Sequence, residues 1–324
     1  MNLLRSWRDN LRTIMISISI LICCFVLSVI YFSIAPPDFQ SGQVVHIKKG
    51  MYMSQAADLL ASDNIVKSAF FLKIYVMMLS GHRQVQAGEY LFDSPQSALG
   101  VAYRLVYGIQ GLPQAKVTLQ EGMTSADMAA AIKKAIPQFD AQTFIALAKP
   151  LEGQLFPDTY FLYPDSTPQD VIDLLHANFT EKTKPLLLAI QAFGKPASEV
   201  ITMASIVEKE ATSTADRRII AGILWKRLAI GMPLQVDPPF YYLLHKDSSQ
   251  LTMSDLAIDS PYNLYKHTGL PPTPIDNPGL NAIEATIDPV QTGYLYYLSG
   301  RDGQMHYAST LAAHLANKTK YLDP

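Results

Sequence analysis

The longest apolar segment of the chain lies near its N-terminus, where 22 residues from Ile14 to Ala35 (IMISISILICCFVLSVIYFSIA) include no charged side chain. As a helix rising 1.5 Å per residue, this segment would extend over about 33 Å, which is enough to cross the hydrocarbon core of a bilayer. Three arginines precede it, and no Lys or Arg follows it before Lys48. By the positive-inside rule, this asymmetry predicts a single transmembrane helix with a cytoplasmic N-terminus and residues 36–324 on the outer side.

A cleaved signal peptide is the alternative interpretation, since Ser33-Ile34-Ala35 resembles a small-residue cleavage site. The apolar region of a signal peptide is usually about 7–15 residues long, which is shorter than this one. Pro36 would also directly follow the cut. The pattern therefore favours a retained anchor, with three parts: a cytoplasmic tail at 1–13, the transmembrane helix at 14–35 and a linker at 36–43.

Shorter patterns follow the linker. The β-branched run VVHI (44–47) predicts a strand, and QAADLLAS (55–62) predicts a helix with its apolar residues on one side. KSAFFLKIYVMML (67–79) predicts a second helix that is apolar nearly all round, and QAGEYL (86–91) predicts another strand. Strand, two helices and strand make a small α+β module, which we assign to residues 44–113.

The remaining residues, 114–324, predict a larger mixed α+β domain. A strand pattern at 115–122 is followed by several helical patterns, including 197–212 and the amphipathic segment 217–230. The last third of the chain is rich in Pro, Gly, Tyr and Asn. Long ordered loops of this kind are a usual place for binding sites. The predicted fold class is thus α+β, behind one transmembrane helix.

Composition excludes several kinds of function. The net charge is −2 and no basic stripe runs through the chain, which argues against nucleic acid as a partner. Both cysteines, Cys23 and Cys24, lie in the apolar segment, so residues 36–324 have no thiol for a disulfide, a nucleophile or a metal site. The seven histidines are scattered, and there is no HExxH, P-loop or GxGxxG. The sequence therefore predicts no metal and no cofactor, and leaves carboxylate chemistry.

Two glutamates, Glu208 and Glu210, stand two positions apart in ASIVEKEA (204–211). On a helix they would point about 160° apart, so they cannot act as an acid and base pair in one cleft. Glu208 shares its face with small residues, Ala204, Ser205, Ala211 and Thr212. Glu210 shares its face with bulky ones, Ile206 and Val207. A face of small residues leaves space for a ligand, and apolar walls raise the pKa of an acid, which favours Glu208 as a general acid. The spacing alone favours the alternative, in which both are ordinary solvated helix charges.

Five motifs in one order resemble the MltG (YceG-like) endolytic murein transglycosylases. They are LEGQLFPDTY (151–160), ASIVEKEA (204–211), RLAIGMPLQVDP (227–238), SPYNLY (260–265) and GLPPTPIDNPG (269–279). The resemblance extends over nearly the whole chain, including the anchor and residues 44–113, which are similar to the LysM-like module of that family. Four positions depart from the family pattern without removing a carboxylate: Gln154, Leu264, Thr273 and Leu315.

The resemblance implies cleavage of the β-1,4 bond between N-acetylmuramic acid and N-acetylglucosamine, in which the muramic C6 hydroxyl closes onto C1 and gives a 1,6-anhydro end. The substrate supplies the nucleophile, so one carboxyl can donate a proton and then take one back, whereas ordinary glycosidases need two. The resemblance assigns this role to Glu208. It also implies five substrate-binding residues: Gln235, Asp237, Tyr262, Asn263 and Tyr265. A turn role is the alternative for Asp237, which precedes Pro238, and for the SPYNLY residues.

The same resemblance implies an enzyme on the bacterial inner membrane whose periplasmic domain cuts nascent glycan strands and ends their elongation. Its implied partners are those strands, the membrane through residues 14–35, and peptidoglycan synthases. Two other functions stay open. One is an inactive, membrane-tethered peptidoglycan-binding protein, and the other is a hydrolytic muramidase in which Asp237 activates water.

Overall fold

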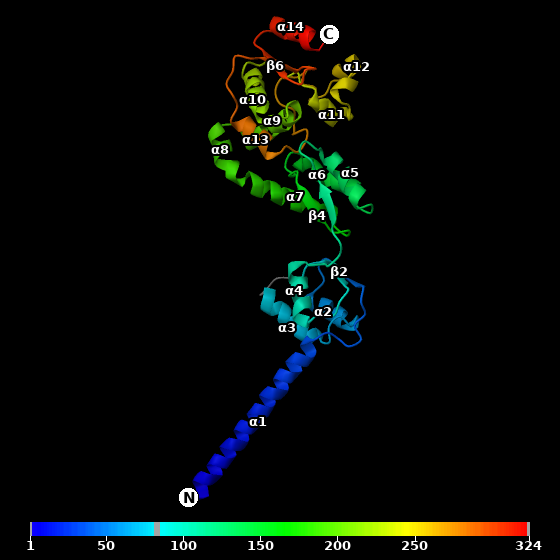
Figure 1. Cartoon of the computed structure of the whole chain (residues 1–324), viewed down its shortest axis with the longest axis vertical. Coiled ribbons are helices and arrows are strands. Elements are labelled where there is room, and N and C mark those ends of the chain that lie inside the picture. The colour runs from blue at the N-terminus through cyan, green and yellow to red at the C-terminus, as the bar shows by residue number, and fades with distance from the viewer. Residues whose placement is uncertain (1, 81–84, 323–324) are drawn as a thin grey trace. The chain divides into compact units, whose positions relative to one another are not determined.

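Residues 2–80 and 85–322 are described by a computed structural model, in which the chain divides into two compact units, residues 1–113 and 114–324 (Figure 1). Helices and strands occur together in both units, so the chain is α+β, as predicted. Each of the three sheets has two antiparallel strands among the described residues.

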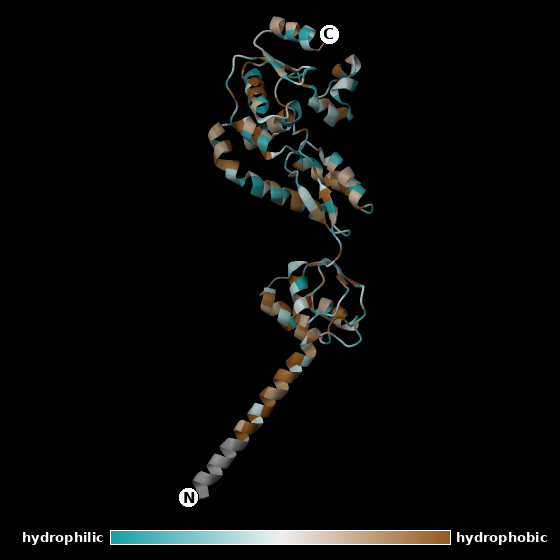
Figure 2. Cartoon of the chain, in the orientation of Figure 1, coloured by the Kyte–Doolittle hydropathy of each residue, from teal (hydrophilic) through white to brown (hydrophobic). Residues whose placement is uncertain are grey.

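Helix α1 (Asn2–Ser33) contains the apolar segment, and it begins within the predicted tail. From Ile14 to Ser33 its mean hydropathy is 2.7, and the most apolar stretch is not buried against the rest of the protein. Figure 2 shows this stretch as a mostly brown, hydrophobic helix. Among the described residues it is the one helix long and apolar enough to cross a membrane. The helix ends just before Pro36 and Pro37, because a proline disfavours helical backbone at the preceding residue.

The first unit has the predicted order of strand, helix, helix and strand, followed by one more helix. Its elements after α1 are β1 (Gln43–Ile47), α2 (Met53–Ser62), α3 (Ala69–Ser80), β2 (Gly88–Phe92) and α4 (Ala98–Tyr107). In the β1–β2 pair, Val45 lies opposite Tyr90, and both side chains are buried. Alternation along the strands sends Ile47 and Phe92 to the same core, where they pack against α2, α3 and α4.

The second unit begins with a two-stranded antiparallel sheet whose strands are separated in sequence by helices. Its first elements are β3 (Ala115–Thr118), α5 (Ser125–Ala135), α6 (Ala141–Ala148), η1 (Lys149–Leu151), β4 (Thr159–Leu162), α7 (Pro168–Thr183), η2 (Lys184–Leu186) and α8 (Leu187–Phe193). Val117 of β3 lies opposite Tyr160 of β4, and both contribute to a core with Met128 and Phe144.

The rest of the second unit is built around α9, which packs against both α10 and α13. Its elements are α9 (Ala197–Glu210), α10 (Thr214–Ala229), α11 (Pro238–Leu244), η3 (Ser248–Gln250), α12 (Met253–Leu256), α13 (Leu280–Ile287), β5 (Tyr296–Ser299), β6 (Met305–Ala308) and α14 (Leu311–Tyr321). Strands β5 and β6 form an antiparallel hairpin around Arg301 to Gly303. These elements bring the end of α9 next to loops from the proline-rich third of the chain.

Helix α9 ends at Glu210, two residues earlier than the predicted end at 212. It stops there because Ala211 has an extended backbone, with φ of −152°. Ala211 and Thr212 therefore do not belong to the helical face on which Glu208 stands. The other small residues of that face, Ala204 and Ser205, are fully buried. Ser205 Oγ accepts a hydrogen bond from the backbone N–H of Ile275 at 3.0 Å. The small side chains of Ala204 and Ser205 therefore pack against other parts of the protein. These parts occupy the space that the sequence predicts for a ligand beside them.

Asp276 supplies a first prediction, on stability. Its side chain is fully buried, and within the described part of the chain neither carboxylate oxygen has a hydrogen-bond partner. Burial raises the pKa of Asp276 well above its ordinary value. The folded protein therefore holds a proton that the unfolded chain releases, so this group's contribution to stability is lost as the pH rises above the ordinary pKa of an aspartate.

We expect Asp276→Asn, which cannot ionise, to raise the melting temperature by roughly 3 °C or more at pH 8, and by less than about 1 °C at pH 4. Thermal unfolding followed by circular dichroism at both pH values measures the difference. An equal effect at pH 4 and pH 8 would contradict the assignment of a buried, protonated carboxyl.

Candidate active site

A cavity of about 690 Å³ opens in the second unit where the end of α9 meets α10, the loop before α11, strand β5 and helix α14. Its lining includes Glu210, Arg227, Gln235, Asp237, Tyr265, Tyr296, Tyr297 and His314. Three of the five predicted substrate-binding residues are therefore in one place with a glutamate. That glutamate is Glu210, and Glu208 does not line the cavity.

Glu210 is the last residue of α9, and this half-buried residue lines the cavity. Burial raises its pKa to about 7, and the negative charge of Asp237 adds to the rise. The Tyr297 hydroxyl and the Arg227 guanidinium oppose that rise. A carboxyl with a pKa near 7 is both protonated and ionised in useful amounts at neutral pH, so it can donate a proton and take one back.

Arg227 places a fixed positive charge in the cavity wall. Its side chain is 5% exposed, and its Nε and Nη1 donate to the carbonyl oxygens of Leu295 and Leu234, each at 2.6 Å. The guanidinium also lies over the ring of Tyr296, 5.1 Å from the ring centre. Because carbonyl oxygens hold it without neutralising it, its charge remains available to stabilise an ionised Glu210.

Asp237 and Tyr265 form a polar pair on another wall. The Tyr265 hydroxyl donates to Asp237 Oδ1 at 2.6 Å. Burial, followed by the bond to Asp237, raises the pKa of Tyr265, so its hydroxyl stays neutral. Asp237 precedes α11, but its side chain makes no capping hydrogen bond to that helix. The alternative turn-capping role for Asp237 is therefore not what the structure shows.

Gln235 has a backbone conformation that is rare for its residue type. Its φ is +50°, in the left-handed region that costs a non-glycine residue about 1–2 kcal/mol. Its neighbours Leu234 and Val236 are buried, its N–H donates to the Leu264 carbonyl at 3.0 Å, and its side chain is exposed at the cavity. The buried neighbours and this bond hold the strained backbone, and strain of this kind is concentrated at functional sites.

We expect Gln235→Gly to raise the free energy of unfolding by about 1 kcal/mol, because it relieves the positive φ, while Gln235→Ala leaves the strain in place. Both variants lose the amide, so both should lose activity equally. Urea unfolding and glycan digestion of the two variants measure these effects. If the glycine variant were no more stable than the alanine variant, the backbone would not be strained here.

The other two predicted binding residues serve the fold of the loop. Asn263 is fully buried, its Nδ2 donates to the carbonyls of Leu256 and Ile258 at 2.9 and 2.8 Å, and its Oδ1 accepts from Tyr265 N–H at 3.1 Å. Its hydrogen-bonding groups are used within the loop, so its predicted contact with substrate stays a prediction that these bonds do not support. Instead it fixes the backbone of Tyr265.

Tyr262 lies on the same loop but outside the cavity lining. Its hydroxyl shares a hydrogen bond of 2.7 Å with Thr273 Oγ1, and its ring packs against Tyr242 with 5.3 Å between ring centres. These contacts correspond to the structural alternative for SPYNLY rather than to stacking on a sugar.

Glu208 is held in a separate, buried network. Its side chain is 5% exposed, one oxygen pairs with Arg217, and Oε2 accepts the Gly279 N–H at 3.0 Å. Burial raises the pKa of Glu208, while the Gly279 N–H and the Arg217 charge lower it. Arg217 also donates to the Ala211 carbonyl and to Asn281, each at 2.9 Å. The network joins α9 to α10 and to the start of α13.

Sequence reasoning missed Arg227, Tyr296 and Tyr297 as components of the site. Arg227 opens the motif RLAIGMPLQVDP, so its place among the family motifs was a usable signal. The tyrosines belong to β5, about 90 residues beyond Glu210 in the chain, and no local pattern links them to α9.

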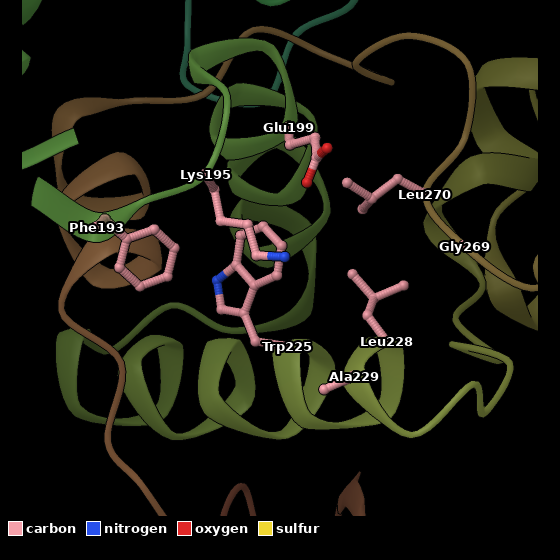
Figure 3. Close-up of a pocket in the computed structure, with 8 residues that line it drawn as sticks. All are labelled: Phe193, Lys195, Glu199, Trp225, Leu228, Ala229, Gly269 and Leu270. Atoms are coloured by element: carbon pink, nitrogen blue, oxygen red, sulfur yellow. The ribbon is translucent and has the colours of Figure 1, made fainter. Parts of the chain in front are cut away.

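A second cavity, of about 400 Å³, lies against α10 and the start of α9 (Figure 3). Phe193 and Trp225 form its aromatic part, and the Lys195 ammonium lies 5.6 Å from the centre of the Trp225 ring. Trp225 and Arg227 are two positions apart, so they point to opposite sides of α10. This cavity is therefore separate from the one at Glu210, and no predicted site residue lines it.

A family model and curated relatives both match most of this chain. The model of the YceG-like family matches residues 45–320. The chain is 33% identical over 305 residues to an endolytic murein transglycosylase of Bacillus subtilis (strain 168), which covers 86% of this chain and 84% of that protein. It is 28% identical over 335 residues to an endolytic murein transglycosylase of Streptococcus pneumoniae serotype 2, covering 90% of this chain and 61% of the relative.

A solved structure is similar as well. The crystal structure of a yceG-like protein from Listeria monocytogenes matches with a TM-score of 0.58 and 28% identity. The match covers 86% of this chain and 99% of that chain.

Proposed function

This chain belongs to the YceG-like family, and from that membership and the cavity at Glu210 we propose that it is a lytic transglycosylase that cleaves peptidoglycan glycan strands internally. The relatives in Bacillus subtilis and Streptococcus pneumoniae carry the name endolytic murein transglycosylase. The observation that carries the proposal is Glu210 in the cavity lining, where burial raises the pKa of its carboxyl to about 7, beside Arg227, Asp237 and Tyr265.

Glu210 is the general acid and base in this proposal, whereas the resemblance of the motifs assigns that role to Glu208, which stays a prediction. Both oxygens of Glu208 are engaged, by Arg217 and by the Gly279 N–H, and its side chain is almost fully buried. Glu210 lines a cavity with room for sugar rings and shares it with Gln235 and Asp237, which can hydrogen-bond sugar hydroxyls or N-acetyl groups. Geometry comes before pKa in choosing a catalytic acid, and it favours Glu210.

The reaction needs one carboxyl in two successive states. Glu210 donates its proton to the oxygen that leaves with N-acetylglucosamine, as the bond from that oxygen to the muramic C1 breaks. The resulting carboxylate takes the proton of the muramic C6 hydroxyl, and the C6 oxygen forms the new bond to C1. Glu210 ends protonated again, no water is consumed, and the nearby charge of Arg227 favours the ionised state in between.

The membrane anchor determines where this reaction takes place. We propose that α1 crosses the inner membrane with the N-terminus in the cytoplasm, which puts residues 36–324 in the periplasm. Residues 44–113 would act as a LysM-like module. Cutting new strands close to the membrane would end their elongation, with peptidoglycan synthases as the implied partners.

Digestion of purified glycan strands in H₂¹⁸O, followed by mass analysis of the products, tests the proposed reaction. A transglycosylase gives 1,6-anhydro ends without ¹⁸O. Labelled reducing ends would instead identify a muramidase in which Asp237 activates water. Binding of strands with no product would identify a tethered binding protein.

The pH dependence of cleavage provides a further prediction. Glu210 must start protonated, so kcat/KM should fall as the pH rises through about 7. Asp237→Asn removes a negative charge that raises the pKa of Glu210, so the pKa falls and the decline should begin at a lower pH. Glu199→Gln, on α9 but outside this cavity, is the matched control and should leave the profile unchanged. An unshifted profile in the Asp237 variant would mean that the titrating group is not Glu210.

A further inference from the structure

Helix α3 exposes large apolar side chains that a helix on a water-facing surface normally would not. Leu72 and Val76 face the core of the first unit, yet Phe70, Met77 and Met78 are 66%, 58% and 74% exposed. An ordinary surface helix presents polar residues on its outer face. The outer face of α3 therefore suits a non-aqueous environment.

Helical geometry gathers the three exposed side chains and the half-buried Ile74 into one stripe. At 100° per residue, Phe70, Ile74, Met77 and Met78 fall within an arc of about 100°, on the side away from the core. The one charged residue of α3, Lys73, lies at the border of this arc and pairs with Asp58 of α2 at 3.1 Å.

The other border of the stripe meets the end of α1. The ring of Phe71 stacks on Phe32, with 5.5 Å between ring centres, and the Tyr75 hydroxyl is hydrogen-bonded to Ser33. Figure 1 shows α3 beside the end of α1, and the two helices are in contact. The apolar surface of the anchor thus continues onto the outer face of α3.

These contacts set the depth of α3. Residues 31–33 are the last turn of α1, so they lie at the outer boundary of the hydrocarbon when the segment from Ile14 onward crosses a bilayer. Tyr31 suits this boundary, where tyrosine is enriched, and the Lys67 ammonium lies 4.0 Å from the centre of its ring, where lipid headgroups would surround it. A helix attached to this turn is held at the interface.

We propose that α3 is a second membrane contact, in which Phe70, Ile74, Met77 and Met78 insert into the interfacial layer of the bilayer beside the anchor. The inference rests on α1 crossing the membrane. A transmembrane helix alone leaves the attached unit free to swing, whereas a helix lying in the interface fixes the orientation of that unit against the surface.

Fluorescence quenching in the full-length protein tests this contact. In a Cys23→Ser/Cys24→Ser background, an NBD probe is attached through Met78→Cys, and the protein is reconstituted into phosphatidylethanolamine and phosphatidylglycerol vesicles. Ser94→Cys, at an exposed site of the same unit beyond β2, is the matched control. We expect nitroxide lipids labelled high on the acyl chain to quench the probe at 78 at least about 3-fold more than the probe at 94.

Equal, water-like emission at positions 78 and 94 would overturn the proposal. Shielding of the probe at 78 from aqueous iodide without quenching by lipid would also overturn it, because a protein would then cover the face. A third sample with only Cys24 labelled reports on the anchor. Deep quenching at Cys24 without quenching at 78 rejects the α3 contact alone, whereas no quenching at Cys24 rejects the transmembrane assignment.

Discussion

Glu210→Gln should lower the rate of glycan cleavage by about 10²- to 10⁴-fold, the usual contribution of a general acid and base. Glutamine keeps the size of the side chain but can neither donate the proton to the leaving oxygen nor take the proton from the C6 hydroxyl. The fold should not suffer, because burial already raises the pKa of Glu210 and an uncharged side chain avoids that cost. Steady-state digestion of a defined glycan oligomer measures kcat, and binding of the same oligomer measures affinity.

A catalytic role for Glu210 predicts that Glu210→Gln lowers kcat while the affinity for glycan and the melting temperature stay unchanged. A residue that only supports the cavity would instead weaken binding or lower the melting temperature when it is replaced. Gln235→Ala serves as the comparison, because it removes a cavity side chain that has no proton to give. Full activity of the Glu210 variant would exclude it as the catalytic acid.

The sequence predicts the features of this molecule that depend on local pattern. An uncharged apolar stretch identifies α1, and the alternation around Val45 and Tyr90 gives the first small sheet. Helical spacing also separates Glu208 from Glu210 correctly, since the structure places the two carboxylates in different surroundings.

The surroundings of the two glutamates depend on contacts between distant parts of the chain. The small neighbours of Glu208 predict space for a ligand, whereas in the structure Ala204 and Ser205 are buried and the Ile275 N–H, about 70 residues further on, bonds to Ser205. The sequence predicts bulky neighbours for the side chain of Glu210. In the structure α9 ends at this residue, and Glu210 lines the cavity. The motif ASIVEKEA by itself predicts neither the contacts beside Glu208 nor the cavity at Glu210.

The roles of residues in the loop motifs also depend on contacts that the sequence does not show. Asn263 and Gln235 both carry amides within motifs that resemble the family pattern, and the sequence treats them alike. In the structure the Asn263 amide is hydrogen-bonded to backbone groups of its own loop, whereas the Gln235 side chain is exposed at the cavity. Burial decides between a structural and a binding role, and burial depends on the whole fold.

Glu208→Gln should lower the free energy of unfolding by about 3–5 kcal/mol, because it leaves the charge of Arg217 buried without its partner. Urea unfolding measures the loss, and activity per folded molecule should stay within a few fold of the unmodified protein. Asp288→Asn is the matched control. It removes the partner of the adjacent Arg218 in an exposed pair of 2.9 Å, which should cost less than about 1 kcal/mol.

A double variant, Glu208→Leu with Arg217→Met, separates the ion pair from the shape of the site. Replacing both charges with apolar side chains of similar size removes the unpaired charge, so it should recover much of the stability that the single variant loses. Cleavage by the double variant would then show that the Glu208 carboxylate is dispensable for the reaction. If Glu208→Gln instead folded as stably as the unmodified protein and lost all cleavage, Glu208 would be the catalytic acid and Glu210 would not.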